Sequence, residues 1–313
     1  MKIVVFCSTT LGLPTLQFLY SQKLLAGIVI PDTKTEEANE ILAIAKNYNI
    51  PYKVVSKNEM SKKLSTWLSL INTDVAFVFG FPFKIPKLLL TATPLGFFNF
   101  HFGALPQYRG STPVFWQIKN REANGAVCIH KMDEGWDTGA IAIQAPVPIR
   151  KGDTYGIHNR ILSDASVQIA HEFIQRLQVL GNKIPLTPQN PKQATYYKRP
   201  TLADISINWE TMTANEIVAL VDACNPWNKG AYTKWQNTAF KIIQISHKEQ
   251  NSVNNQQLKA GVIINCTKNK TIDIATVDNN VLSIDVISID EGIFAADFLS
   301  QLGLKENQLL VKP

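Results

Sequence analysis

The sequence predicts an α/β protein with a Rossmann-like, mostly parallel sheet, followed by a small OB-like β-barrel at the C-terminus. Two observations lead to this prediction. Apolar strands alternate with helical patterns through the first half of the chain, as in a doubly covered parallel sheet. The last third instead contains short alternating strands separated by turns, which suggest a small barrel or a sandwich. Of these we predict the barrel. The expected divisions of the 313 residues are a first domain over 1–184, a linker over 185–202 and a second domain over 203–313.

The predicted elements of the first domain follow from the spacing of apolar residues. Pro14 fits the first turn of a helix, and residues 74–80 are apolar on both faces, as in a buried parallel strand. In such a sheet, ligands bind beyond the carboxyl ends of the strands. The stretch "CSTTLGLPT" has one glycine where a dinucleotide site needs three, which argues against a nicotinamide cofactor. We expect strands over 2–7, 24–30 and 74–80, and helices over 14–22, 36–49, 61–72 and 156–180.

The predicted second domain begins after a segment without periodicity. Residues 181–201 are rich in Pro, Asn and Lys, which indicates a linker. Beyond it we expect a helix over 213–224, a polar loop over 248–259, and strands over 240–246, 261–266, 271–277 and 281–289.

Composition limits the cellular setting and the partners. The four cysteines form no CxxC pair. No signal-peptide core and no apolar run long enough to span a bilayer is visible. We therefore expect a cytoplasmic protein without a membrane partner. Residues 1–202 hold 22 Lys and Arg against 13 Asp and Glu, a balance of +9. Residues 203–313 hold 9 against 12, a balance of −3. An anionic partner should therefore meet the first part of the chain.

Asn99 and His101 stand two apart at the end of an apolar strand, so both side chains point to the same face. Asp137 lies on the glycine-bearing loop "MDEGWDTGAI", which can fold over this strand end. A carboxylate beside an imidazole orients it, and an amide can donate to an oxyanion, so the three groups suit acid–base chemistry at a carbonyl. The residues leave a structural alternative open, in which His101 is a satisfied core residue, Asn99 caps a turn and the acids are solvated. The other histidines show no metal-ligand spacing, and we expect no metal.

The patterns N-x-H-x-x-x-L-P-x-Y-R-G and M-D-E-G-x-D-T-G-x-I resemble the signature of the methionyl-tRNA formyltransferase family of folate-dependent N-formyltransferases. The separation of His101 and Asp137 agrees with that of the family's catalytic pair. The stretches "DISINW", "NPWNKGAYT" and "FAADFLSQLGLKENQLL" resemble parts of the family's second domain. The resemblance covers nearly the whole chain and implies the formyltransferase fold.

The resemblance implies a reaction in which a primary amine takes the formyl group of 10-formyltetrahydrofolate through a tetrahedral intermediate. Asn99 and His101 would stabilise the oxygen of that intermediate, and Asp137 would keep His101 charged. The segment after the histidine would contact the folate, although "GALP" departs from the family's usual Ser-Leu-Leu-Pro. The implied folate contacts are Phe81, Phe83, Ile85, Gly103, Ala104, Leu105, Pro106, Asp133, Glu134 and Gly135, and the implied substrate loop is Tyr108, Arg109 and Gly110.

The aromatic residues among these folate contacts could equally be ordinary core residues, and the sequence leaves that alternative open.

The acceptor amine follows less directly. The basic, glycine-rich insertion usual in the methionyl-tRNA enzymes is missing, and Asp290 and Glu291 replace a Lys/Arg pair before the final helix. We therefore expect a small-molecule or carrier-bound amine, such as a nucleotide-linked amino sugar or an aminoacyl group. The alternative is methionyl initiator tRNA, which the basic first domain could attract. The sequence does not indicate the oligomeric state.

Two other classes of function remain. A 10-formyltetrahydrofolate hydrolase would use the same Asn/His/Asp trio, with water in place of the amine. A non-catalytic nucleic-acid-binding barrel would need a basic and aromatic stripe, which the acidic second domain lacks.

Overall fold

The structure is a computed structural model that describes residues 1–248, 259–266 and 270–313. Most of the polar loop predicted over 248–259 therefore lies outside the described residues. The chain divides into two compact units, and their bounds differ from a simple cut after residue 184. The first unit comprises Met1–Pro113, Asn124–Pro148 and Asn159–Lys198, and the second comprises Val114–Ala123, Ile149–His158 and Arg199–Pro313. No helix within the described ranges is long and apolar enough to cross a membrane.

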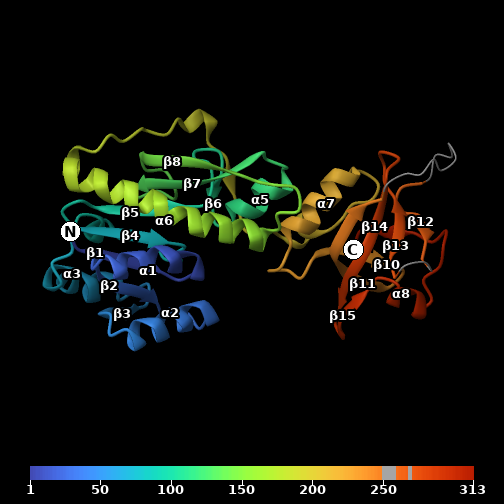
Figure 1. Cartoon of the computed structure of the whole chain (residues 1–313), viewed down its shortest axis with the longest axis horizontal. Helices are drawn as coiled ribbons and strands as arrows, with labels where there is room; N and C mark the ends of the chain where they lie inside the picture. The colour runs from blue at the N-terminus through green and yellow to red at the C-terminus, as the bar shows by residue number, and fades with distance from the viewer. Residues whose placement is uncertain (249–258, 267–269) are drawn as a thin grey trace. The chain divides into compact units, whose positions relative to one another are not determined.

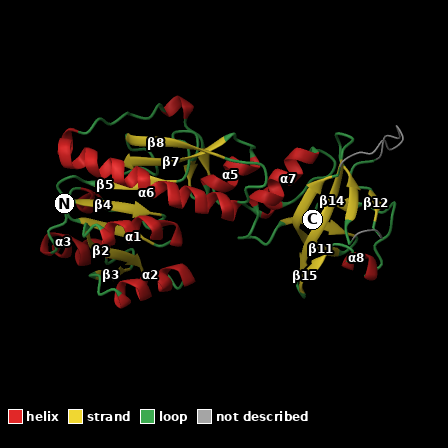
Figure 2. Cartoon of the chain, viewed as in Figure 1, coloured by secondary structure: helices red, strands yellow, loops and turns green. Residues whose placement is uncertain are grey.

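The first unit is built on a sheet of seven described strands in the order β3-β2-β1-β4-β5-β7-β8 (Figures 1 and 2). The pairs from β3 to β5 are parallel, and β5–β7 and β7–β8 are antiparallel, so the predicted mostly parallel sheet is confirmed. Its strands are β1 (Ile3–Cys7), β2 (Leu25–Pro31), β3 (Tyr52–Val55), β4 (Val75–Phe79), β5 (Phe97–His101), β7 (Asn124–Lys131) and β8 (Ile141–Pro148). The helices are α1 (Leu13–Ser21), α2 (Glu36–Asn47), α3 (Met60–Leu70), α4 (Lys87–Leu90) and, from Asn159 on, α6 (Tyr155–Leu180).

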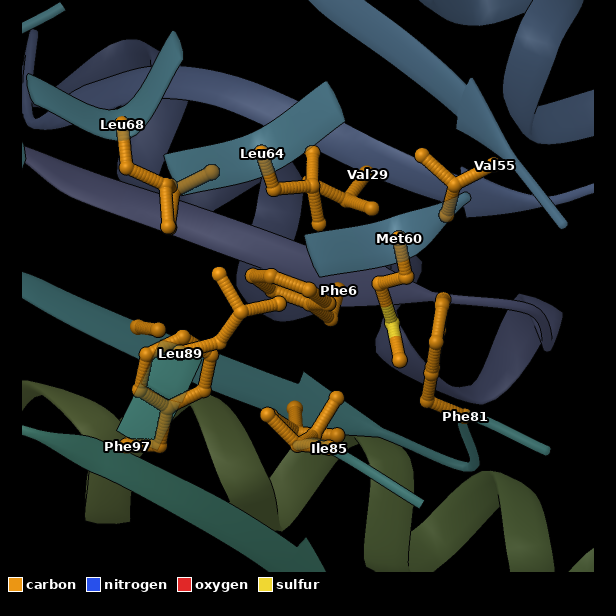
Figure 3. Close-up of a cluster of buried hydrophobic side chains, with 13 residues drawn as sticks. Phe6, Val29, Val55, Met60, Leu64, Leu68, Phe81, Ile85, Leu89 and Phe97 are labelled. Carbon is orange, nitrogen blue, oxygen red and sulfur yellow. The ribbon is translucent and has the colours of Figure 1, made fainter. Parts of the chain in front are cut away.

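Both faces of this sheet are covered, which explains why all residues of β1 and β4 are buried. On one face, Thr15 of α1 and Ser166 of α6 share a buried hydrogen bond of 2.8 Å. On the other face, α3 and α4 pack onto alternate residues of β1, β2, β4 and β5. Figure 3 shows the resulting hydrophobic cluster, which includes Phe6, Val29, Met60, Leu64, Leu68, Phe81, Ile85, Leu89 and Phe97.

The predicted linker does more than connect the two units. Thr187 forms an antiparallel bridge with Ile141, and a short strand β9 (Tyr196–Tyr197) pairs in parallel with β6 (Arg109–Gly110). Residues 187–198, which we call the strap, therefore belong to the first unit. The absence of periodicity indicated irregular backbone, but not these pairings with segments far away in the sequence. The exact bounds of the linker and the two domains stay a prediction.

The second unit contains an antiparallel sheet of the predicted barrel type. Its described strands run in the order β12-β13-β14-β11-β10-β16, and β15 also pairs with β14. A bridge between Val262 and Leu309 brings the two edges together, with Ile263 N donating to Gln308 O at 2.9 Å, so the sheet nearly closes. The elements are α5 (Pro113–Lys119), α7 (Ala214–Ala223), β10 (Ala231–Trp235), β11 (Thr238–His247), β12 (Ile263–Asn265), β13 (Ile272–Ala275), β14 (Val281–Ile289), β15 (Gly292–Ala295), α8 (Phe298–Gln301) and β16 (Leu310–Val311).

Candidate active site

The three residues predicted to be catalytic lie together at the carboxyl end of β5. Asn99 and His101 lie on the face of the strand that also carries Phe97, and the loop between β7 and β8 brings Asp137 to them. Asp137 Oδ1 lies 3.4 Å from Asn99 Nδ2 and 3.7 Å from His101 Nδ1. The predicted juxtaposition of amide, imidazole and carboxylate is therefore present in the structure.

The hydrogen bonds of His101 define which ring nitrogen can take a proton. Nε2 lies 2.6 Å from the carbonyl oxygen of Tyr108, an acceptor, so Nε2 carries a proton and donates to it. Nδ1 then faces the carboxylate of Asp137. Burial lowers the pKa of His101, although Asp137 and the Tyr108 carbonyl oppose this change. The lowered pKa favours the neutral imidazole, with Nδ1 as its proton acceptor, whereas the resemblance implies that Asp137 keeps the histidine charged.

Asp137 is held as an anion at the centre of the site. Burial alone would raise its pKa, but the charge of His101 in its protonated form, the hydrogen bond from His130 and the backbone amide of Gly110 hold the pKa well below its usual range. The Gly110 amide donates to Oδ2 at 2.9 Å. The backbone of Asp137 has a φ of 54°, in the left-handed region that a residue with a side chain adopts only at a cost. The surrounding structure must therefore hold this conformation.

A second imidazole, that of His130, completes the surroundings of Asp137, and our sequence analysis did not assign it to the site. His130 is 2% exposed, and its Nε2 lies 3.2 Å from Asn99 Nδ2 and 3.5 Å from Asp137 Oδ1. The antiparallel register of β5 and β7 places His130 directly opposite Asn99. A signal for it exists in the sequence, because residues opposite one another on paired strands share a face.

The predicted folate contacts after β4 divide into buried and half-buried side chains. Phe81 and Ile85 are 8% and 2% exposed and belong to the hydrophobic cluster of Figure 3. Phe83 is only partly buried, and its ring meets that of Phe81 edge-on at 5.6 Å. The side chains of Phe81 and Ile85 thus serve the core, as the open alternative held. Of these three side chains, that of Phe83 is exposed enough to contact a ligand.

The predicted contacts on the β7–β8 loop adjoin that same region. Glu134 forms an exposed ion pair of 2.7 Å with Lys87, which follows the 81–86 loop at the start of α4. Asp133 organises its own loop, because its Oδ1 accepts from the Gly135 amide at 2.9 Å and from Thr138 Oγ1 at 2.6 Å. The two groups of predicted folate contacts therefore line neighbouring loops.

The segment Gly103–Pro106 lies on the other side of His101. A Cβ atom at Gly103 would lie 2.8 Å from His101 Nε2 and 3.0 Å from the Tyr108 carbonyl oxygen, so glycine leaves space around the imidazole. Leu105 is buried, and its amide donates to Gln144 Oε1 at 2.8 Å; Ala104 and Pro106 flank it in the chain.

The predicted substrate loop is held by the strap. The ring of Tyr108 stacks on that of Tyr197 with centroids 5.1 Å apart. Arg109 donates from Nε and Nη2 to Gln189 Oε1, at 3.0 and 2.7 Å. Gln189 lies in the predicted linker, and no spacing or periodicity in the sequence indicated a place for it in the site.

The described residues contain no group of three or more His, Cys, Asp or Glu side chains that could hold a metal ion. The polar groups at the end of β5 are instead an amide, two imidazoles and one carboxylate. That set provides hydrogen-bond donors and a proton acceptor around a single anion.

Comparison with known families defines the class of this protein. Residues 1–174 match the formyl transferase family, and residues 201–301 match the formyl transferase C-terminal domain. The chain therefore belongs to the formyl transferase family and is a formyl-transferring enzyme.

Both sequence relatives and solved structures are similar to this chain. The methionyl-tRNA formyltransferase of Halothermothrix orenii is 26% identical over 99% of this chain and 100% of its own length. That of Desulforamulus reducens is 30% identical over 71% of this chain and 70% of its own. Among solved structures, an N-formyltransferase from Helicobacter canadensis in complex with folinic acid and dTDP-3-aminofucose has a TM-score of 0.67 at 19% identity, covering 91% of this chain and 98% of that one. HypX from Aquifex aeolicus in complex with tetrahydrofolic acid has a TM-score of 0.63 at 16% identity, over 98% of this chain and 48% of that one.

Proposed function

We propose that this enzyme transfers the formyl group of 10-formyltetrahydrofolate to the primary amine of a small molecule or a carrier-bound group, such as a nucleotide-linked amino sugar or an aminoacyl group. The observation that carries the proposal is the arrangement of Asn99, His101 and Asp137 at one strand end. It places an amide donor and an imidazole 3.4 and 3.7 Å from an oxygen of the Asp137 carboxylate. Folate as co-substrate is supported by the folate compounds bound in two structural neighbours.

His101 accepts a proton during the reaction, and Asp137 stabilises the positive charge that results. The neutral imidazole has its free lone pair on Nδ1, so Nδ1 takes the proton that the attacking amine must lose. The Asp137 carboxylate stabilises the imidazolium formed in this way. The imidazolium then returns the proton to the departing folate nitrogen, which leaves the protein in its starting protonation state.

Asn99 and the protonated His101 stabilise the charge that develops on the formyl oxygen. The Asn99 amide donates to that oxygen, and the present contacts of its Nδ2, at 3.2 and 3.4 Å, are long enough to exchange. Nε2 of His101 already donates to Tyr108 and Nδ1 faces Asp137, so the imidazolium acts on this oxygen through its positive charge, which exists only after the first proton transfer. 10-Formyltetrahydrofolate supplies the formyl group, and Phe83 with the Asp133–Gly135 and Gly103–Pro106 segments would hold it.

The charges of the second unit favour a small or carrier-bound amine. Asp290 and Glu291 are both exposed at the turn between β14 and β15, where they would repel a phosphate backbone. The alternative acceptor, methionyl initiator tRNA, is favoured by the match of the whole chain to a methionyl-tRNA formyltransferase and by the basic balance of residues 1–202.

The test is tetrahydrofolate release from 10-formyltetrahydrofolate by the purified full chain. Three reactions are compared, with a nucleotide-linked amino sugar, with methionyl initiator tRNA, and with no acceptor. Release that depends on the amino sugar supports the proposal, and release that depends on the charged tRNA supports the alternative. Equal release without acceptor would make the protein a hydrolase. No release in any reaction, together with no folate binding, would refute folate-dependent formyl transfer.

A further inference from the structure

We propose that Gln189 of the strap is a positioning residue for the reaction, because its amide clamps the backbone that carries Asp137 to the substrate loop that carries Arg109. This inference rests on the proposed formyl transfer. All of the contacts that carry it lie within the first unit.

One side of the clamp acts on the catalytic loop. Gln189 Nε2 donates to the carbonyl oxygens of Asp137 and Gly139, at 2.8 and 2.7 Å. Its two N–H groups thus hold both ends of a three-residue stretch whose first residue has the left-handed φ of 54°. That conformation costs energy in a residue with a side chain, and the two hydrogen bonds fix the carbonyls on either side of Thr138 and so oppose its relaxation.

The other side of the clamp acts on the substrate loop. Gln189 Oε1 accepts both hydrogen bonds from Arg109, and the amide of Arg109 donates to Thr195 O of the strap at 3.2 Å. The next residue, Gly110, approaches the strap so closely that a Cβ atom would lie 1.9 Å from Tyr197 O. Gly110 is also the residue whose amide binds the Asp137 carboxylate.

Gln189 therefore connects the two segments that define the surroundings of His101. The Nδ1 atom of His101 faces Asp137 of the catalytic loop, and its Nε2 atom donates to the carbonyl of Tyr108 in the substrate loop. A change in the separation of these segments alters both contacts at once. Because a misplacement of about 1 Å in such a site can cost about a hundredfold in rate, the clamp has a direct effect on kcat.

The test uses Gln189→Ala and Gln189→Glu in the full chain. Gln189→Ala removes the hydrogen bonds to Arg109 and to the backbone carbonyls of Asp137 and Gly139. Gln189→Glu keeps the acceptor for Arg109 but replaces the donor to those two carbonyls with a second acceptor. Both variants should lower kcat by about tenfold to a hundredfold and leave KM for the folate within about threefold. Gln193→Ala is the matched control, because this glutamine is exposed and lies in the same strap.

A role in stability alone would give a different pattern. Gln189→Glu would then retain the wild-type kcat, and Gln189→Ala would lower the urea midpoint without lowering kcat of the folded enzyme. Either result would overturn the proposal.

Hydrogen exchange tests the clamp without relying on activity. In Gln189→Ala, peptides that cover 108–112 and 135–140 should exchange faster, and peptides from α3 and β4 should not change. If the wild type transferred no formyl group but this exchange pattern held, the proposed function would fail and the clamp would stand. Unchanged exchange in both loops would refute the clamp.

Discussion

Asp273 in the second unit is a buried carboxylate and Asp137 in the first is a partly buried one, and their surroundings differ in kind. Asp273 lies on β13 and meets Lys248 in a close ion pair, Ser283 Oγ at 2.9 Å and Asn265 Nδ2 at 3.2 Å. Asp137 has one short bond, from the Gly110 amide, and its contacts with Asn99, His130 and His101 lie at 3.4, 3.5 and 3.7 Å.

The difference separates a carboxylate that holds a fold from one that is available for chemistry. The Asp273 side chain is 2% exposed on a regular strand, whereas that of Asp137 is 13% exposed on a backbone of positive φ. Short bonds around Asp273 satisfy the charge completely within the protein. Long contacts around Asp137 leave partners that can move to a substrate during the reaction.

Replacement of His101 should produce the largest effect on activity. His101→Gln removes the proton acceptor at Nδ1 and should lower kcat by about a hundredfold or more. Formyl transfer under saturating folate measures this, and the far-ultraviolet circular dichroism should match the wild type. Turnover within a few-fold of the wild type would show that His101 is one of the ordinary core histidines.

Asp273→Asn should reduce the stability of the protein rather than its activity. It breaks the ion pair with Lys248 and should lower the free energy of unfolding by about 2 kcal/mol, less than for a fully buried pair because the Lys248 side chain is half-exposed. Urea unfolding measures the loss, and kcat of the folded enzyme should stay within about twofold. A large fall in kcat at unchanged stability would remove the distinction between the two carboxylates.

Ser283→Ala should produce a smaller change of the same kind. It removes the hydrogen bond that Ser283 Oγ donates to Asp273, at a cost of about 1 kcal/mol in unfolding free energy. The comparison with Asp273→Asn in the same urea series shows whether the bonds around this carboxylate contribute as expected. Equal stability of Ser283→Ala and the wild type would mean that the bond is dispensable.

The site also predicts a pH dependence. Because burial lowers the pKa of His101 below 6.5, the imidazole is neutral and active above that value, and kcat/KM should fall with acid through a midpoint below pH 6.5. The Asp137 charge raises this pKa, so in Asp137→Asn the acid limb of the residual activity should move further to low pH. An acid limb that moved to higher pH would contradict the assignment.

The proximity of Asn99, His101 and Asp137 was predictable because each of them lies in a local pattern. The period of two puts Asn99 and His101 on one face, and two glycines flank the turn that presents Asp137. His130 was within reach of the same reasoning, since it lies opposite Asn99 once β5 and β7 are paired. The strands β1, β2 and β4 were predictable for a different reason, because burial on both faces leaves long apolar runs, whereas the short, partly exposed strand β3 was not predicted.

The strap was not predictable in this way. Gln189 contacts Asp137 and Arg109, which are 52 and 80 residues away, and an isolated glutamine in an aperiodic segment carries no sign of such partners. The closing bridge of the barrel between Val262 and Leu309 is similarly distant. Phe83 is partly exposed whereas Phe81 and Ile85 are buried. This difference depends on the path of the loop across the core, which the sequence pattern does not indicate.

The most direct test of the account is a single-turnover reaction of wild type and Asp137→Asn with 10-formyltetrahydrofolate carrying a ¹³C-labelled formyl group and the amine that supports turnover. The label should move to the amine nitrogen in the wild type, and Asp137→Asn should bind the folate but transfer the label at least about a hundredfold more slowly. Transfer by Asp137→Asn at the wild-type rate would contradict it, because the Asp137 carboxylate would then be, like Asp273, a structural group.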